Sequence, residues 1–211
     1  MTILPCSGDD PEADVLSAAK RALMSGLPII YPTETLYALG GRALDGEAGR
    51  RVRAAKGREE GKPLPLVAAG REQVLALCSA WPDAAERLGA CFWPGPLTLV
   101  LPSSATVPVE VTAGGGTVAV RVPGLELTRR LCLAAGPLVS TSANVSGHGA
   151  PATCAEAAGH LAGAVTLALD AGPRFGRPST IVDVSSDVPR LLREGAVPWA
   201  EVESVLRAAA S

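Results

Sequence analysis

The sequence predicts a mixed α/β fold in which parallel and antiparallel strands form a twisted sheet flanked by helices. Three observations lead to this prediction. The 211 residues are 47% hydrophobic, which is enough for a buried core. Short apolar runs typical of strands are interspersed with amphipathic segments in an irregular order. Several predicted strands are joined by segments too short for a crossover helix, so those strands are antiparallel.

Helices are predicted where apolar periodicity is bounded by capping residues. The segment 10–26 begins at Asp10, which suits an N-cap, continues with Pro11 and ends at Gly26. A second helix over 45–57 begins at Asp45 or Gly46 and ends at Gly57. The other predicted helices are 71–80, 82–92, 125–136, 153–163 and 198–210.

Strands are predicted where short apolar runs lie between turn residues. The predicted strands are 27–32, 64–69, 97–102, 117–123, 137–142, 164–170, 179–184 and 188–195. The stretch 102–117 is rich in glycine and small polar residues and is expected to be a long loop. Because the length suits one domain, we predict a single domain over 1–211, with a core over about 10–197 and a C-terminal helix over 198–210.

The composition narrows the classes of function. The net charge of −2 gives the chain no overall attraction to nucleic acid or to an anionic membrane. The five cysteines are scattered and form no C-x-x-C pair, and the two histidines are too few for a His-rich metal centre. We therefore expect reduced thiols, no metal held by the protein, and a cytoplasmic location. Neither a signal peptide nor an apolar run of membrane-spanning length is expected.

A basic cluster lies at the end of the predicted helix 45–57. Its members between residues 50 and 62 are Arg50, Arg51, Arg53, Lys56, Arg58 and Lys62. The cluster is either a solvated helix face or an anion site. Lys56 and Arg58 favour an anion site, because they flank the glycine that ends the helix just before a predicted strand. Arginine offers a planar fork to phosphate oxygens, and lysine offers a compact charge.

Two segments gather hydroxyl groups where predicted strands end. "YPTETLYALGG" (31–41) is either a turn capped by threonines or the hydroxyl-lined wall of a pocket at a strand's carboxyl end. "LVSTSANVSG" (138–147) runs from an apolar pair into serines, a threonine and an asparagine. This segment is either a hydroxyl-rich turn with satisfied internal hydrogen bonds or a set of short donors that phosphates can approach closely, where longer side chains would block entry.

Arginines also close two predicted strands. Arg121 ends the strand within 117–123, and a charged residue this close to the core needs a partner. Arg121 either pairs with an internal carboxylate such as Asp170 or Asp183 or binds an anionic ligand. Ser179 opens the predicted strand 179–184 and Arg193 closes 188–195, each a weak signal by itself.

Several familiar motifs are excluded. "GREEGKP" (57–63) has three residues between its glycines where a Walker A loop needs four, and Pro63 stands in place of the metal-binding hydroxyl. His148 and His160 lie among small residues without a nucleophile elbow, so a Ser-His-Asp triad is not supported. A glycosidase-like carboxylate pair has no support either.

Taken together, the segments resemble the YrdC/YciO family of threonylcarbamoyl-AMP synthases. The resemblance runs from about Pro28 to Val197. It rests on six motifs in the family's order, "YPTETLYALG", "KGREEGKPLPLV", "FWPGPLTLVLP", "TVAVRVP", "STSANVSG" and "PSTIVDV…PRLLREGAV". The fold it implies is a YrdC/DHBP-synthase-like mixed sheet with an open cleft.

The resemblance also implies a reaction and its participants. Family members make threonylcarbamoyl-adenylate from L-threonine, bicarbonate or CO2, and ATP, and release pyrophosphate. Mg²⁺ is expected to arrive with the nucleotide. The product feeds the threonylcarbamoyladenosine modification of tRNA, so transfer to a tRNA threonylcarbamoyltransferase and weak contact with tRNA are implied, without a membrane. The chain resembles the short form of the family.

The resemblance assigns site residues by position. Those on the threonine side are Thr35, Arg121, Ser140 and Ser179. Those on the ATP side are Lys56, Arg58, Lys62, Thr117, Ser142, Asn144 and Arg193. We expect Arg121 to hold the threonine carboxylate, and Arg193 to add charge opposite the phosphates. Lys56 and Arg58, which hold the triphosphate and the departing pyrophosphate, are the expected catalytic pair.

Three residues depart from the family pattern. Ala38 replaces a usual glycine, Lys62 occupies a position that is often asparagine, and Val67 stands where some relatives carry a threonine-contacting histidine. Selectivity for threonine is therefore less secure than nucleotide binding. The alternatives are a YciO-type paralogue with drifted or no synthase activity, a carbamoyl-adenylate domain of the hydrogenase-maturation type, and an RNA-binding module. The scarcity of aromatic residues, 3% of the chain, disfavours the last.

Overall fold

The computed structural model describes residues 1–59 and 61–207. Its helices are α1 (Ala13–Met24), α2 (Gly46–Lys56), α3 (Arg71–Leu75), α4 (Asp83–Phe92), α5 (Val109–Thr112), α6 (Glu126–Ala135), α7 (Cys154–His160) and α8 (Trp199–Arg207). Its strands are β1 (Thr2–Pro5), β2 (Ile29–Pro32), β3 (Tyr37–Gly40), β4 (Leu66–Val67), β5 (Leu97–Pro102), β6 (Thr117–Arg121), β7 (Leu138–Val139), β8 (Thr141–Ser142), β9 (Leu167–Asp170), β10 (Thr180–Asp183) and β11 (Arg190–Arg193).

One sheet, which we call the β2 sheet, has the strand order β1-β9-β2-β3-β8. β1, β9 and β2 run parallel, whereas β3 is antiparallel to both β2 and β8. Both faces of β2 are buried: Ile29 and Tyr31 pack in one hydrophobic cluster with α1 and α6, and Ile30 packs in the other with α7. A strand covered on both faces is apolar throughout instead of alternating, as the sequence of β2 is.

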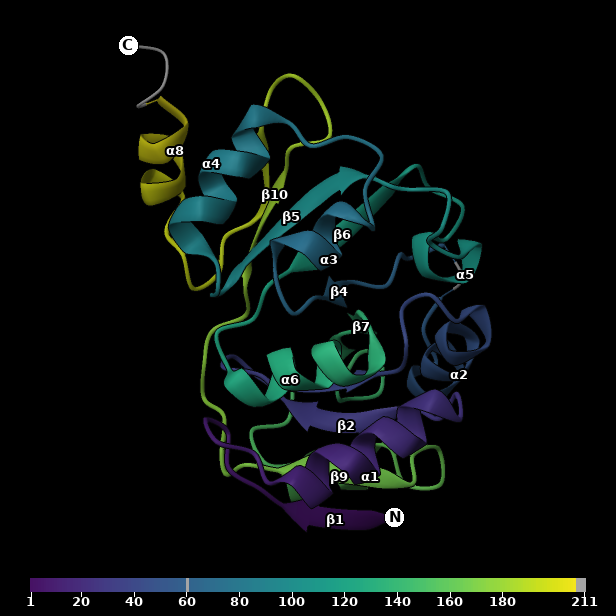
Figure 1. Cartoon of the computed structure of the whole chain (residues 1–211). Coiled ribbons are helices and arrows are strands. Elements are labelled where there is room, and N and C mark those ends of the chain that lie inside the picture. The colour runs from purple at the N-terminus through teal and green to yellow at the C-terminus, as the bar shows by residue number, and fades with distance from the viewer. Residues whose placement is uncertain (60, 208–211) are drawn as a thin grey trace.

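The other sheet, which we call the β5 sheet, has the order β11-β10-β5-β6-β4-β7. β10 is parallel to β5 and β4 is parallel to β6, whereas β5 and β6 are antiparallel. α4 and α8 pack on each other and share a hydrophobic cluster with β5 and β10. Figure 1 shows this sheet with α4 and α8 at one end of the molecule and the β2 sheet with the N-terminal strand at the other.

The two sheets meet at residues 138–142. β7 pairs with β4 in the β5 sheet, and β8 pairs with β3 in the β2 sheet, so the chain passes between sheets at Ser140. The Tyr31 hydroxyl donates a hydrogen bond of 2.8 Å to the carbonyl oxygen of Val139 across this junction. Gly40 is required here, because a Cβ atom at that position would lie 1.7 Å from the same carbonyl oxygen. This close approach places the hydroxyl-rich segment between the sheets.

The mixed α/β class and the mixture of strand directions are confirmed. The strands divide into two sheets where one was expected, and the predicted strand 137–142 is two short strands. The predicted N-cap at Asp10 is wrong, because α1 begins after Glu12. Asp45 is confirmed as a cap, since its side chain accepts from the backbone N–H groups of Glu47 and Ala48. Residues 208–210 of the predicted C-terminal helix lie outside the described residues.

Candidate active site

A cavity of about 550 Å³ lies where the two sheets meet, a volume suited to a small-molecule ligand. β3 and β8 of one sheet and β4, β5, β6, β10 and β11 of the other contribute to its wall. The predicted site residues that line it are Thr35, Arg58, Arg121, Ser140, Ser142, Asn144, Ser179 and Arg193. Segments spread over more than 150 positions of the chain therefore converge on one hollow.

A smaller hollow of about 250 Å³ adjoins this cavity. The two share Arg58, Ser142 and Asn144 in their walls, so they lie side by side. Lys56 and Lys62 line the smaller part. The sequence-predicted cations thus lie at both ends of a single binding region.

Lys56 is held by the loop that follows β8. Its side chain is buried, and the ammonium group donates to the backbone carbonyl oxygens of Ser142 and, at 2.7 Å, Asn144. Burial, together with the positive charge of Arg58, lowers the pKa of Lys56 from 10.5 to about 8. Lys56 therefore organises the Ser142–Asn144 loop and supplies positive potential to the smaller hollow.

Arg58 follows Gly57, the glycine at the end of the helix α2. Gly57 ends that helix with a φ of 58°, a left-handed conformation that glycine adopts without strain. The Arg58 guanidinium donates to the carbonyl oxygen of Pro63 at 2.9 Å, which fixes it against the next loop. Burial and the neighbouring charge of Arg53 lower its pKa. Lys62 is exposed and pairs with Glu59 at 3.1 Å, so it lies at the rim.

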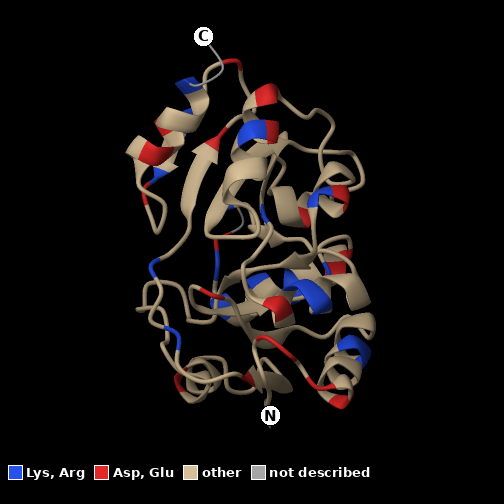
Figure 2. Ribbon diagram, turned by 60° about the vertical axis from the view of Figure 1, so that its left-hand side comes forward, with Lys and Arg blue, Asp and Glu red and all other residues tan. Residues whose placement is uncertain are grey.

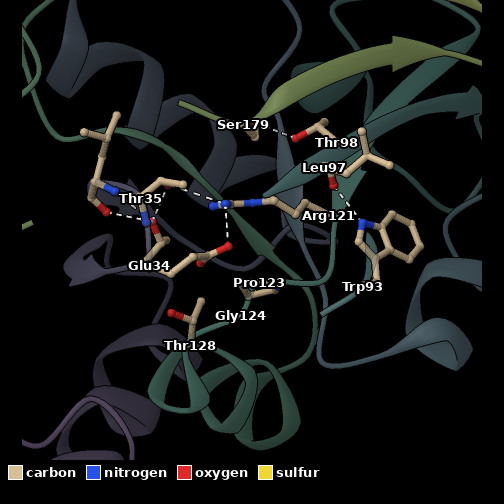
Figure 3. A network of polar contacts seen from close by, with 12 residues as sticks. Glu34, Thr35, Trp93, Leu97, Thr98, Arg121, Pro123, Gly124, Thr128 and Ser179 are labelled. Carbon is tan, nitrogen blue, oxygen red and sulfur yellow. Dashed lines mark hydrogen bonds and ion pairs between the residues drawn. The ribbon is translucent and has the colours of Figure 1, made fainter. Parts of the chain in front are cut away.

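Arg121 pairs with Glu34, and the sequence-based candidates Asp170 and Asp183 are wrong. One guanidinium nitrogen, Nη1, lies 2.9 Å from Glu34 Oε1 and 3.4 Å from Thr35 Oγ1 (Figure 3). Asp170 instead accepts from the Tyr37 hydroxyl, and Asp183 pairs with Arg190. Arg121 therefore has an internal partner, as the first alternative required. It also lines the cavity, and its binding of an anionic ligand stays a prediction.

Ser179 and Arg193 form a second polar group on the β5 sheet. Arg193 donates through Nε and Nη2 to the carbonyl oxygen of Ser179, at 3.1 and 2.8 Å. The hydroxyls of Ser179 and Thr98 share a hydrogen bond of 2.8 Å. Burial, and to a smaller extent the positive charge of Arg121, lowers the pKa of Arg193.

The electrostatics of the cavity favour an anion. Arg58, Arg121 and Arg193 line it, and no Asp or Glu does so among the described residues. Figure 2 shows basic and acidic residues interspersed along the rest of the ribbon, so this concentration of cations is local. The repulsion among these positive charges is reduced when an anionic ligand binds in the cavity.

Two of the predicted ATP-side residues, Thr117 and Asn144, contribute less directly to the cavity. Thr117 lies on the same face of β6 as Ala119 and Arg121, but beyond the part of the strand that lines the cavity. The side-chain amide of Asn144 donates to the carbonyl oxygens of Val145 and His148, so it shapes its own loop. Both residues stay predictions as nucleotide ligands.

Sequence reasoning missed three residues at the site. Glu34 lies between the two threonines of "YPTET". A carboxylate within this hydroxyl-rich motif could have indicated a partner for a buried arginine. Thr98 is a polar residue inside the apolar strand β5, and its hydroxyl orients Ser179. His148 lines the cavity from the loop after β8, where its context gave no signal.

Comparison with known proteins places the chain in a family. A model of the Sua5/YciO/YrdC family, described as telomere recombination, matches residues 21–195. The chain belongs to the Sua5/YciO/YrdC family. Ala38 and Val67, which depart from the pattern of this family, both line the cavity.

Two curated relatives are similar over nearly the whole chain. A threonylcarbamoyl-AMP synthase of Pyrococcus abyssi is 41% identical over 98% of this chain and 61% of its own length. A putative threonylcarbamoyl-AMP synthase of Mycobacterium leprae is 34% identical over 97% of this chain and 93% of its own length. The chain thus spans about three fifths of the Pyrococcus relative and nearly all of the Mycobacterium one.

Solved structures of the Sua5/YciO/YrdC family agree with the fold. P. abyssi Sua5 complexed with L-threonine superposes with a TM-score of 0.93 at 38% identity, covering 98% of this chain and 61% of that one. E. coli YciO gives a TM-score of 0.85 at 26% identity, covering 93% and 97%. Within residues 1–59 and 61–207, no helix is long and apolar enough to cross a membrane.

Proposed function

We propose that this chain is an L-threonylcarbamoyladenylate synthase, a nucleotidyltransferase that joins threonine carbamate to the adenylyl group of ATP. The observation that carries the proposal is the convergence of Arg121, Arg58 and Arg193 on one cavity between the sheets. The site thereby offers a fork for a carboxylate and separate cations for phosphates. The names of the curated relatives and the threonine complex of P. abyssi Sua5 support the same activity.

The amino-acid end of the site is proposed to lie at Arg121. Its guanidinium binds the threonine carboxylate, and Thr35, Ser140 and Ser179 supply hydroxyls around it. Arg121 is nearly buried, so a charge-assisted hydrogen bond there is screened less than one at the surface. This end orients the amine of threonine toward the rest of the cavity.

The nucleotide end is proposed to extend from Arg193 past Arg58 into the smaller hollow. Arg58 and Arg193 contact phosphate oxygens, with Lys62 at the rim and Ser142 and Asn144 in the loop between. Lys56 holds that loop in place through the Ser142 and Asn144 carbonyls. Thr117 is kept as a proposed nucleotide contact.

The chemical step needs positioning and charge stabilisation more than covalent catalysis. The threonine amine adds to CO2 and loses a proton, which gives the carbamate. A carbamate oxygen then forms a bond to the α-phosphorus as the bond from that phosphorus to the bridging oxygen breaks and pyrophosphate departs. Arg58 and Arg193 stabilise the negative charge that accumulates on the leaving group.

Mg²⁺ is proposed to enter with ATP. The described residues include no cluster of three or more His, Cys, Asp or Glu side chains that could hold an ion, and the cavity wall offers hydroxyls and cations. Such a wall fits an ion bound mainly by phosphate oxygens and water, as Mg²⁺ prefers. When bound, the ion neutralises phosphate charge.

The product is an activated acyl-adenylate that a second enzyme must use. We propose that a tRNA threonylcarbamoyltransferase takes it in the cytoplasm, with weak contact of this chain to tRNA. The net charge of −2 gives the chain no overall attraction to a polyanion, which fits weak contact better than tight RNA binding.

Pyrophosphate release from ATP tests the proposed function. Release is expected only when L-threonine and bicarbonate are both present, together with an adenylate whose mass matches the threonylcarbamoyl adduct. Release that is independent of threonine, or tight RNA binding without any release, would refute the synthase proposal.

A further inference from the structure

Glu34 is the acidic partner of Arg121 at the proposed amino-acid end of the site. Its Oε1 atom accepts from Nη1 of Arg121 at 2.9 Å, yet Glu34 is not among the residues that line the cavity. Figure 3 shows the Glu34 carboxylate beside the guanidinium and near Gly124. The exposed fractions of the two side chains are 8% for Arg121 and 23% for Glu34, so water screens this ion pair only partly.

The backbone fixes Glu34 in this place. The Thr33 hydroxyl bonds with the backbone of Thr35 and Leu36 and closes the turn between β2 and β3. The segment before β10 packs against this turn so closely that a Cβ atom on Gly176 would lie 2.8 Å from the Thr35 Cα atom. On the other side, a Cβ atom on Gly124 would be 3.4 Å from Glu34 Cγ. Gly176 therefore packs against the backbone of this turn and Gly124 against the Glu34 side chain, and together they restrict where the carboxylate can lie.

The pair leaves much of the Arg121 fork free for a ligand. Nη1 is occupied by Glu34 and Thr35, whereas Nε and Nη2 have no hydrogen-bond partner within the described part of the chain. A guanidinium carries five N–H donors, so it can hold one carboxylate with one edge and a second with another. Glu34 thus orients Arg121 so that its remaining donors meet a ligand carboxylate.

Glu34 also sets the net charge of the amino-acid end. The Arg121–Glu34 pair is neutral before a ligand arrives. Arg58 and Arg193 line the same cavity, but a ligand carboxylate that shares the Arg121 guanidinium with Glu34 lies beside a like charge in a partly buried site, which is costly. An α-amino acid brings an ammonium group two bonds from its carboxylate carbon, and this restores neutrality.

We propose that Glu34 is a positioning residue that orients Arg121 and makes the site select a zwitterionic α-amino acid over a carboxylate that lacks the ammonium group. The proposal rests on the proposed function and deepens it, because it names the feature of threonine that the site requires. Among the described residues, Glu34 is the one acidic side chain that pairs with Arg121.

The experiment compares L-threonine with 3-hydroxybutanoate, which is threonine without its amino group. Binding of each to the wild-type chain and to Glu34→Gln is measured by calorimetry, and the KM values for threonine and ATP are measured by pyrophosphate release. The Gln variant keeps an oxygen that can accept from Arg121 but loses the charge. Glu86→Gln is the matched control, because Glu86 pairs with Arg71 at 2.6 Å on the exposed surface away from both hollows.

We expect wild type and Glu86→Gln to prefer L-threonine by roughly 10- to 100-fold, the factor of a charge-assisted contact. In Glu34→Gln the preference should fall to about threefold or less, with a raised KM for threonine and an unchanged KM for ATP. Glu34→Asp should recover part of the preference, which a purely structural role does not require.

Two results would overturn the proposal. If Glu34→Gln is folded and keeps the wild-type preference, Glu34 does not select the ammonium group. If wild type itself binds both compounds equally, the site does not select a zwitterion. The proposal is then refuted by the wild-type measurement alone. Failure of the proposed function is recognised separately, since wild type would then release no pyrophosphate in response to threonine.

Discussion

The ammonium group of Lys56 donates a hydrogen bond of 2.7 Å to the backbone carbonyl oxygen of Asn144. The last residue of α2 is thereby tied to the loop that follows β8, 88 positions away in the sequence. The loop contributes Ser142 and Asn144 to both hollows, so this contact sets the shape of the proposed phosphate end.

Replacing Lys56 with Met tests that role. Lys56→Met keeps most of the side-chain length but removes the charge and the donors to the loop. We expect pyrophosphate release to fall roughly 100-fold, the loss of about two charge-assisted contacts. The free energy of unfolding should change by no more than about 2 kcal/mol, because losing the hydrogen bonds and relieving a buried charge oppose each other. Lys20→Met, on the exposed face of α1, is the control and should keep wild-type activity.

The pH dependence of nucleotide binding tests the ionisation of Lys56. Its pKa of about 8 means that the ammonium form predominates at pH 7 and is largely lost by pH 9. The affinity for a non-hydrolysable ATP analogue should therefore fall several-fold between pH 7 and pH 9. Lys56→Met should show a flat profile over the same range. An equal fall in both proteins would show that another group titrates.

Stability should respond to pH in the opposite sense at this residue. The pKa of Lys56 in the folded chain lies below the ordinary value of 10.5, so burying the ammonium costs free energy. That cost is present in full below pH 8 and is relieved as pH rises from 8 to 10.5. Denaturant titrations should show wild type gaining stability relative to Lys56→Met over this range. A constant difference would contradict the lowered pKa.

The sequence predicted the elements whose signal is local. The strand predicted over 97–102 coincides with β5, and Asp45 and Gly57 cap α2 as their residue types indicate. Such features depend on residues that are close together in the sequence, so they can be predicted from a single sequence.

Long-range features were less accessible. The division of 137–142 into β7 and β8 depends on which strands lie on either side of Ser140, and no local pattern reveals that. β1 was not predicted, because Thr2–Pro5 is a short edge strand defined by its pairing with β9. Likewise, the position of Arg121 at the end of an apolar strand indicated that it has a partner. The identity of that partner could not be predicted, because Glu34 lies 87 positions away in the sequence.

The geometry of the Arg121 fork can be tested by a substitution that keeps the charge. Arg121→Lys replaces a planar group that can bind Glu34 and a ligand carboxylate together with a single ammonium. The KM for threonine should rise at least tenfold, with the KM for ATP within about twofold of wild type. A rise confined to ATP would place the amino acid elsewhere in the cavity.

The tight packing around Thr35 gives a further prediction. Gly176→Ala would place a Cβ atom 2.8 Å from the Thr35 Cα atom and carbonyl oxygen, so one segment must move. We expect a loss of about 1–3 kcal/mol in the free energy of unfolding and a raised KM for threonine. Gly159→Ala is the control: it lies in α7 with open space around it, and alanine favours a helix. The control should be as stable as wild type or more so.

The central claim is that one cavity between the two sheets binds the amino acid and the nucleotide side by side. A crystal structure of the chain with L-threonine and a non-hydrolysable ATP analogue tests it most directly. The account predicts the threonine carboxylate on Arg121 and phosphate oxygens at Arg58 and Arg193. Electron density for either ligand outside the two adjoining hollows, with Arg121 still bound to Glu34 alone, would contradict it.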